Sequence, residues 1–409
     1  DDLGIGDVSA YNEGSAWETP NIDQLAASGM SFSDAHTGSA LCTPTRYGIL
    51  TGRYSWRSTL KNHGYNGYSP PLIEDDRFTI AELFKGEGYQ TAIVGKWHVG
   101  WNWSLVGSEK VHYDDRLVPV IDFSKPIKNG PQSQGFIYSF GTLASLSSPP
   151  FVWVENSRPT AIPSDISVNY DEKAFWRKGP KADFDHVEVL SEITDRSIQY
   201  IGEQSGNEDP FFLYVAMTAP HAPIIPKSEW IGKSKVSAYG DFVLQVDYEV
   251  GRIVNAITNN DRLKNTLIFF TSDNGQSPRA DFDDDELPLA NHQGSYIYRG
   301  KKFDIFEGGH RVPFIASWPG KIEQASSSDE IICTTDFMAT AADMLEVELK
   351  DDAAEDSISF LPVLLGENYK RPLREATVHH SSYGRFAIRQ GDWKLILWPG
   401  SGGWAFPAT

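Results

Sequence analysis

The sequence has little cysteine and no long hydrophobic run. Cys42 and Cys333 are its only cysteines among 409 residues, so a scaffold held together by several disulfides is excluded. The longest unbroken apolar run, Phe211 to Met217, is far shorter than the roughly 20 residues that a helix needs to cross a bilayer. No secretory signal segment is visible in this sequence, and we expect the natural chain to begin upstream of Asp1 and to continue beyond Thr409.

Positive charge is also scarce. Lys and Arg number 36 against 55 Asp and Glu, which gives a net charge of −19. A general nucleic-acid binder needs a basic face, so this class of protein is excluded. The overall field would not attract an anionic substrate, and any anion site must therefore be a local cluster of Lys, Arg and His. Aromatic residues make up 12% of the chain, which is typical of a globular protein rather than a disordered one.

Apolar strands alternate with helices over most of the chain. The patterns predict strands at 30–33, 90–94, 211–217, 265–272 and 312–318, and helices after Thr19 and at 79–86, 185–203, 246–257 and 336–345. This alternation predicts an α/β protein with helices on both faces of its sheet. The proline-rich segment 150–185 is expected to be loop-like.

The character of the sequence changes near residue 366. Short strands are predicted at 375–380, 385–390 and 393–398, and Gly391-Asp392 forms a turn between the last two. We therefore expect an α/β domain over residues 1–365 and a small antiparallel β subdomain, incomplete at its end, over residues 366–409.

Polar residues stand at four places where ligand-binding groups are expected. Segments 95–98, 219–221 and 272–275 follow apolar strands directly, and Asp1-Asp2 opens the chain. Ligands of open α/β sheets bind beyond the carboxyl ends of the strands. One such group is more often a turn or a cap, but four together, rich in carboxylate, Lys and His, favour a functional site.

Four of these residues offer only hard oxygen ligands. They are Asp1, Asp2, Asp273 and Asn274, a set that suits Ca²⁺, or less well Mg²⁺, better than zinc. No zinc-binding spacing of Cys and His is present. The acidic run 281–286 could be a second cation site, but a solvated acidic loop is the preferred interpretation, because its carboxylates are too contiguous for a calcium-loop pattern.

Cys42 stands just before a predicted helix. Pro44 suits the first turn of that helix, which would end before Gly52, and Arg46 lies about one turn beyond Cys42. A lone cysteine is most often a small buried hydrophobe, and a thiolate nucleophile is the next interpretation. A simple cysteine hydrolase, however, would not explain the oxygen-rich cation site.

The segment 42–46, Cys-Thr-Pro-Thr-Arg, resembles the Cys-x-Pro-x-Arg signature of the type I sulfatases. Further segments resemble the same family in the same order: Asp-Asp-Leu-Gly at 1–4, Thr-Gly-Arg-Tyr at 51–54, Gly-Lys-Trp-His-Val-Gly at 95–100, Ala-Pro-His at 219–221, Ser-Asp-Asn-Gly at 272–275, and 299–302 with 307–313. This resemblance implies an alkaline-phosphatase-like α/β fold with a small C-terminal antiparallel sheet. The family's strand before the Asp-Asp segment is missing from the sequence.

The resemblance also implies a role for each matching residue. Cys42 would be converted to Cα-formylglycine by a formylglycine-generating enzyme, and its hydrate would attack sulfur with one hydroxyl and expel sulfate with the other. The cation would be held by Asp1, Asp2, Asp273 and Asn274. Arg46 would stabilise the alkoxide, Lys96 and Lys302 would hold sulfate oxygens, His221 would protonate the leaving alcohol, and His98 would take the proton that is released with sulfate.

The substrate is indicated less directly. Trp101 and Trp103 follow the segment that holds Lys96 and His98, and with His310 they are candidates for contacts with a sulfated oligo- or polysaccharide. The alternatives are a phosphodiesterase or phosphonate-ester hydrolase of the same superfamily, and a glycan-binding protein without turnover. The resemblance favours a periplasmic or secreted enzyme. Cys333 has no motif around it and is expected to be buried and structural.

Overall fold

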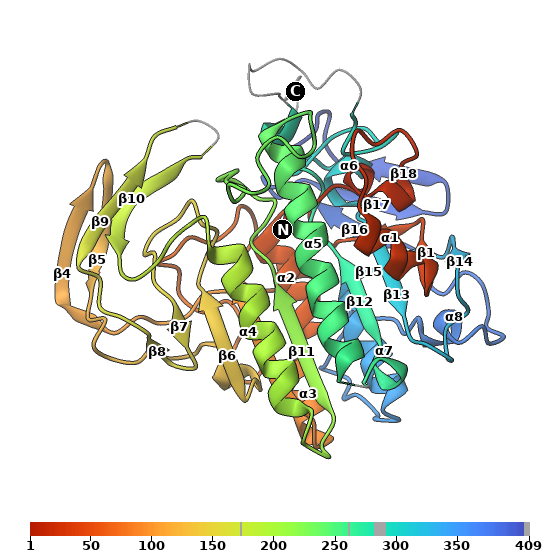
Figure 1. The fold of residues 1–409 in the computed structure, drawn as a ribbon. Helices are drawn as coiled ribbons and strands as arrows, with labels where there is room; N and C mark the ends of the chain where they lie inside the picture. The colour runs from red at the N-terminus through yellow and green to blue at the C-terminus, as the bar shows by residue number, and fades with distance from the viewer. Residues whose placement is uncertain (172–173, 261, 282–291, 405–409) are drawn as a thin grey trace.

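Two mixed β-sheets carry the strands that position the candidate site (Figure 1). The computed structural model describes residues 1–171, 174–260, 262–281 and 292–404. One sheet has the order β11-β3-β6-β7-β8, formed by Phe211–Ala216, Gln90–Lys96, Tyr138–Thr142, Val154–Glu155 and Arg158–Pro159. The other has the order β12-β13-β1-β14, formed by Ile268–Thr271, Phe314–Ser317, Met30–Phe32 and Ser326–Ser328.

Helices cover both faces of the five-stranded sheet. α4 packs on β3, β6 and β11, and α3 packs on β3 and on α7; Figure 1 shows α4 and α5 on either side of β11 in this view. The α-helices are α1 (Pro20–Ala27), α2 (Cys42–Thr51), α3 (Ile80–Gly86), α4 (Val189–Gln204), α5 (Ala238–Asn259), α6 (Glu307–His310), α7 (Phe337–Met344) and α8 (Leu361–Leu364). Short 3₁₀ helices lie at Ile5–Asp7, Ser9–Tyr11, Ser55–Arg57, Pro131–Gln134, Leu263–Asn265, Pro278–Asp281 and Thr334–Asp336.

Local sequence explains where the helices begin and end. The Thr79 hydroxyl accepts a hydrogen bond from the Glu82 amide, and the Glu82 carboxylate accepts one from the Thr79 amide, so a capping box starts α3. α2 ends at Gly52, which has a left-handed backbone at φ +64°. On α5, Val246, Val250 and Ile257 are buried, as their helical spacing predicts. None of the helices in the described part of the chain is long and apolar enough to cross a membrane.

Most predicted elements are confirmed, but the prediction of a loop over 150–185 is wrong. That segment contributes β7 and β8 to the main sheet and forms the hairpin of β9 (Asp165–Asn169) and β10 (Trp176–Lys181). A second hairpin, β4 (Leu105–Tyr113) with β5 (Arg116–Ile121), was not predicted. β4 is largely exposed, so it lacks the apolar signal on which strand prediction depends.

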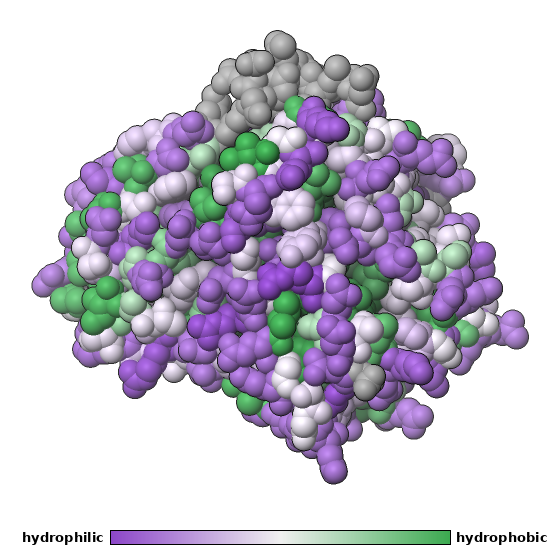
Figure 2. Space-filling view, in the orientation of Figure 1, coloured by the Kyte–Doolittle hydropathy of each residue, from purple (hydrophilic) through white to green (hydrophobic). Residues whose placement is uncertain are grey.

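These two hairpins form a separate part of the molecule that we name the hairpin lobe (β4, β5, β9 and β10). It lies at the left of Figure 1, away from the C-terminal sheet. Several large apolar side chains are exposed on it, and Figure 2 shows green patches on this side of an otherwise mostly hydrophilic surface. They include Leu105, Val106, Leu117 and Ile166.

The C-terminal antiparallel sheet is confirmed. β16 (Thr377–His380), β17 (Phe386–Gln390) and β18 (Trp393–Ile396) follow one another in it. Its first strand contacts the chain just before Cys42: the Ala40 amide donates to the His380 carbonyl at 3.0 Å. A two-stranded sheet of β2 (Ala35–His36) and β15 (Ile332–Cys333) lies in the same part of the fold. The domain boundary at residues 365 and 366 stays a prediction.

Candidate active site

The predicted site residues meet at the carboxyl ends of the central strands. β3 and β11 are parallel, with Gly95 opposite Ala216, so the segments that follow them leave the sheet at the same edge. The N-terminus lies at this edge too (Figure 1). The Asp2 amide donates to a carboxylate oxygen of Asp273 at 3.1 Å, which joins the start of the chain to the segment after β12.

The four predicted cation ligands lie together. Asn274 donates through Nδ2 to Asp2 Oδ1 at 2.8 Å. Asp2 has a left-handed backbone at φ +65°, an uncommon state for a residue other than glycine and one that is concentrated at functional sites. Asp1 Oδ1 and Asn274 Oδ1 are buried and have no hydrogen-bond partner among the described residues. Two buried oxygens without donors, beside Asp2 and Asp273, fit a hard divalent cation.

Three basic side chains neutralise these carboxylates. Lys96 donates to Asp1 Oδ2 at 2.6 Å. Lys302 donates to both oxygens of Asp2, at 2.6 and 2.7 Å. Arg46 donates to Asp273 Oδ2 through Nε at 3.0 Å and through an NH2 nitrogen at 2.7 Å. Although the net charge of the chain is −19, three positive side chains are thus concentrated at this one site.

Cys42 is the first residue of α2 and is only 2% exposed. Ligand-type atoms of Asp1, Asp2, Cys42 and His221 all lie within 4.8 Å of one another. Arg46 lies one helical turn after Cys42, on the same side of α2. Both residues lie close enough to Lys96 to affect the pKa of that lysine. Cys333 is buried and unbridged, as predicted.

The two predicted histidines hold defined positions. His98 Nε2 lies 3.0 Å from the Tyr65 carbonyl, which fixes a proton on that nitrogen, and its buried Nδ1 has no partner among the described residues. His221 Nδ1 lies 2.5 Å from the Ala222 carbonyl, which leaves Nε2 as the basic atom. That Nε2 is 3.6 Å from Asp2 Oδ2 and 3.4 Å from the Ser145 hydroxyl.

Burial and neighbouring charges set the protonation of the site. Burial, with the positive charges of Lys302 and Lys96, lowers the pKa of His221 to about 3 against the opposing charge of Asp2. Burial also lowers the pKa of Lys96 to about 8. For Lys302 burial is outweighed by Asp2, and its pKa is raised. The site therefore presents neutral histidines and a firmly charged Lys302.

All three predicted substrate contacts are buried in the structure. Trp101 and Trp103 are 3% and 9% exposed and belong to the hydrophobic core, so neither offers a free ring face to a sugar. His310 is fully buried at the end of α6, away from any open surface. Trp101 and Trp103 were predicted because they follow the Lys96 and His98 motif closely, but closeness in sequence did not give exposure.

His310 belongs to a second buried group, which we name the histidine cluster (Asp34, His36, Glu307, His310, His379, Arg389 and Lys394). Lys394 donates to His310 Nε2 at 2.6 Å, the Nδ1 atoms of His310 and His36 are 3.0 Å apart, and His36 Nε2 lies 2.7 Å from Asp34. His310 and His379 are stacked, with centroids 3.8 Å apart and ring planes at 9°. Stacked rings cannot both point in-plane lone pairs at one metal ion, so this cluster is a hydrogen-bonded network.

Sequence reasoning missed two groups beside the site. They are Ser145, next to His221, and the Tyr65 carbonyl, next to His98. Ser145 follows β6, and the rule of seeking polar residues after apolar strands would have found it had that strand been recognised. Of the two neighbouring lysines, Lys302 reaches the site while Lys301 donates to Gln276. Positions 282–286 of the acidic run lie outside the described residues.

Comparison with known proteins identifies the family. The sequence model described as Sulfatase matches residues 1–347. The chain belongs to the sulfatase family. An N-acetylgalactosamine-6-O-sulfatase of Bacteroides thetaiotaomicron is 34% identical over 97% of this sulfatase and 80% of that protein. An N-acetylgalactosamine-6-sulfatase of Sus scrofa is 32% identical over 99% of this sulfatase and 71% of its own length.

Solved structures agree with this assignment. A structure from work on the metabolism of multiple glycosaminoglycans by Bacteroides thetaiotaomicron has a TM-score of 0.82 at 32% identity, over 97% of this sulfatase and 86% of that chain. A sulfatase from Pseudoalteromonas sp., at 24% identity and a TM-score of 0.74 over 97% and 76% of the two chains, shares the fold. The protein is thus a sulfuric ester hydrolase with an alkaline-phosphatase-like fold.

Proposed function

We propose that this sulfatase removes sulfate from a sulfated carbohydrate, and that its substrate unit is a 6-O-sulfated N-acetylgalactosamine. The names of the relatives that are 30–34% identical over nearly the whole chain support this substrate. The observation that carries the proposal is the meeting of Cys42, the four oxygen ligands and the basic side chains in one buried cluster.

The proposal includes two groups that the chain must acquire. One is Cα-formylglycine at position 42, made by a formylglycine-generating enzyme; its hydrate supplies the attacking hydroxyl and a second hydroxyl whose collapse releases sulfate. The other is Ca²⁺, with Mg²⁺ as the second choice, held by Asp1, Asp2, Asp273 and Asn274, where it supplies positive charge for the sulfate oxygens. The partnerless oxygens of Asp1 and Asn274 support that ligand set.

The basic side chains would bind the sulfate group. Once Asp1 and Asp2 hold a cation, Lys96 and Lys302 are free to donate to sulfate oxygens instead of to carboxylates. Arg46 stays fixed on Asp273 by two hydrogen bonds, and from there it stabilises negative charge at residue 42.

The two histidines would move protons. His221 is neutral in the free site, but the negative charge of a bound sulfate ester opposes the effect of Lys96 and Lys302 and raises its pKa again. It then gives the proton on Nε2 to the leaving alcohol. His98 has its proton fixed at Nε2 by the Tyr65 carbonyl, so its Nδ1 is the atom that accepts a proton when sulfate is released.

The substrate proposal is tested by measuring free sulfate. The enzyme should release sulfate from N-acetylgalactosamine 6-sulfate, and much less from the 4-sulfate of the same sugar or from N-acetylglucosamine 6-sulfate. Equal rates on all three would contradict the assigned sugar but leave the sulfatase activity intact. Release of phosphate from phosphodiesters, without sulfate release, would favour the phosphodiesterase alternative.

Maturation is tested by mass spectrometry of the peptide that spans residues 37–46. Enzyme from a host with a formylglycine-generating enzyme should carry the aldehyde at position 42. Thiol alone in fully active enzyme would exclude the proposed nucleophile, and a thiol form that binds sulfated glycans without turnover would match the binding-protein alternative.

We also propose a periplasmic or secreted location and the division into residues 1–365 and 366–409.

A further inference from the structure

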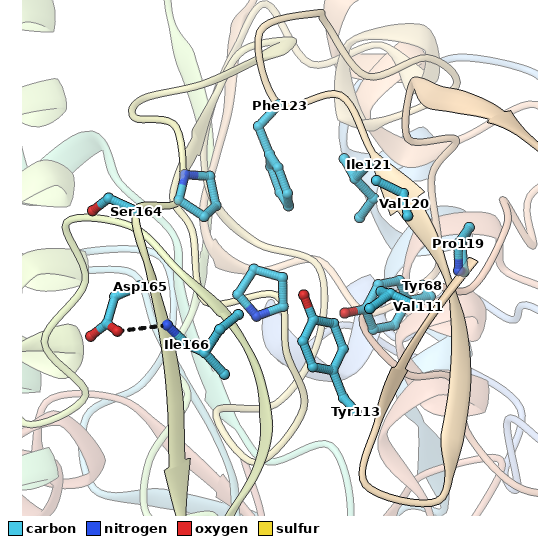
Figure 3. Close-up of a pocket in the computed structure, with 12 residues that line it drawn as sticks. Tyr68, Val111, Tyr113, Pro119, Val120, Ile121, Phe123, Ser164, Asp165 and Ile166 are labelled. Carbon is cyan, nitrogen blue, oxygen red and sulfur yellow. Dashed lines mark hydrogen bonds between the residues drawn. The ribbon is translucent and has the colours of Figure 1, made fainter. Parts of the chain in front are cut away.

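A pocket of about 450 Å³ opens between the two hairpins of the hairpin lobe (Figure 3). This volume lies within the range of small-molecule sites, roughly 300–1,000 Å³. Aromatic and proline rings form much of its wall, among them Tyr68, Tyr113, Phe123 and Pro180. Flat apolar rings with polar tips suit the face of a sugar ring, which is apolar, and its edge, which carries hydroxyls.

Polar groups in the pocket suit an uncharged ligand. The hydroxyls of Tyr68 and Tyr113 end beside each other near its middle (Figure 3). The Tyr68 hydroxyl is buried and has no hydrogen-bond partner among the described residues. Asp165 is the one charged side chain among the twelve residues that line the pocket, and no Lys, Arg or His is among them. A sulfated or carboxylated ring would meet a carboxylate there and no cation.

The segment 65–68 links this pocket to the candidate active site. The Tyr65 amide donates to the Thr43 hydroxyl, next to Cys42, and the Tyr65 carbonyl contacts His98. Tyr68 lines the pocket three residues later, so its Cα is at most about 11 Å from that of Tyr65. One short segment of chain thus contributes to the active site and to the wall of the pocket.

Two further sets of contacts lie between the pocket and the candidate active site. Trp101 packs edge-on against Trp103 at 5.3 Å, and Trp103 against Phe123 at 5.6 Å, so the buried tryptophans that follow His98 support a wall of the pocket. On the other side, Pro149 lies against Gly179, beside Pro180, and is four residues from Ser145, which contacts His221.

We propose that this pocket binds an uncharged sugar ring of the glycan substrate, close in the chain to the sulfated ring whose ester is cleaved. The proposal rests on the proposed function, because it takes a sulfated glycan as the substrate. It assigns the recognition of the sulfated ring to the cationic site and that of its neutral neighbour to the hairpin lobe. Trp101 and Trp103 then act as positioning residues behind Phe123.

The kinetic test compares a short and a long substrate. For Tyr113→Ala we expect KM to rise about three- to tenfold on a 6-sulfated oligosaccharide with neutral neighbouring rings, the effect of losing one stacking ring, with kcat unchanged. On the 6-sulfated monosaccharide both constants should stay at the wild-type values. Tyr113→Phe should recover most of the oligosaccharide KM. Tyr248→Ala, at an exposed tyrosine on α5, is the matched control and should change neither substrate.

A binding test separates failure of this proposal from failure of the proposed function. Cys42→Ala protein should bind a desulfated oligosaccharide of hexose and N-acetylhexosamine, measured by calorimetry, and the added change Tyr113→Ala should weaken that binding to the same extent. If the wild type releases no sulfate from any saccharide but this binding remains, the function is wrong and the pocket stands. Equal effects of Tyr113→Ala on both substrates, or none on either, would overturn the pocket assignment.

Discussion

Two buried clusters in this sulfatase contain the same kinds of side chain and differ in how these are paired. The candidate active site and the histidine cluster both combine carboxylates, histidines and basic residues. In the histidine cluster every imidazole nitrogen of His36, His310 and His379 has a partner. In the active site Asp1 Oδ1, Asn274 Oδ1 and His98 Nδ1 have none among the described residues.

The difference shows which buried charges are structural and which await a ligand. A fully paired network is stabilised by its own hydrogen bonds, and a metal ion could bind there only by breaking them. Unpaired buried oxygens cost free energy, and they persist where a ligand completes them. Composition alone could not separate the two clusters, since each contains three or more residues of metal-binding type.

The largest expected effect is the loss of the cation. Asp273→Asn should remove bound calcium and lower kcat/KM for sulfate release by at least about 10³-fold, because several kcal/mol of charge stabilisation is lost. Elemental analysis of the purified protein should fall from one equivalent of divalent metal per chain to none. His379→Gln, in the histidine cluster, is the matched control and should keep one equivalent. A second equivalent that depends on His379 would erase the distinction between the clusters.

The next effect is on proton transfer alone. His221→Ala should keep the cation and the fold and lower kcat by at least about 10²-fold, as expected for the loss of a general acid. The loss should be smaller on an aryl sulfate, whose leaving group needs no proton. His36 has no contact with the active site in the described structure. The control variant His36→Gln should therefore keep kcat within about twofold. An equal loss on both substrates would assign His221 a role other than proton donation.

The sequence predicted the active site better than it predicted the surroundings. Lys96, His98 and His221 stand in short motifs at the ends of apolar strands, as does Asp273 with Asn274, and those strands bring them to one edge of the fold. The Asp2 amide and the Asn274 amide group join the start of the chain to this edge. The histidine cluster could not be predicted, because it joins β2, α6 and the C-terminal sheet, elements far apart in the chain. The hairpin lobe has neither motifs nor a clear apolar periodicity, and the buried Trp103 packs against Phe123, which follows β5 of that lobe.

The third prediction concerns stability. Lys394 donates to Glu307 at 2.9 Å and to His310 at 2.6 Å, and both partners are mostly buried. Lys394→Met should therefore lower the free energy of unfolding by about 1–3 kcal/mol, since it removes the donor to Glu307 Oε1 and to the His310 ring nitrogen, while Arg311 stays on Glu307 Oε2. Urea unfolding at pH 7 measures this. The double variant Lys394→Met with Glu307→Gln should recover part of the lost free energy of unfolding. No recovery would mean that Lys394 and Glu307 are not energetically coupled.

The smallest effect is a change in the pH dependence of stability. Burial, with the charges of His36 and Lys394, holds the pKa of His379 well below its usual value of 6.5. Above about pH 6.5 the ring is neutral in both the folded and the unfolded chain and contributes no pH dependence. Below that pH the unfolded chain takes up a proton that the folded chain does not, so the free energy of unfolding falls by up to about 1.4 kcal/mol per pH unit.

His379→Gln removes this titration, so its urea midpoint should fall less between pH 6.5 and 5 than that of the wild type, whatever its stability at pH 7. His112→Gln, at an exposed histidine on β4, controls for the loss of a histidine as such. Identical slopes for His379→Gln and the wild type would mean that the buried ring is protonated in the folded state. Its stack on His310 and its bond to the Thr37 carbonyl would then belong to a charged network, and the contrast with the active site would rest on hydrogen-bond pairing alone.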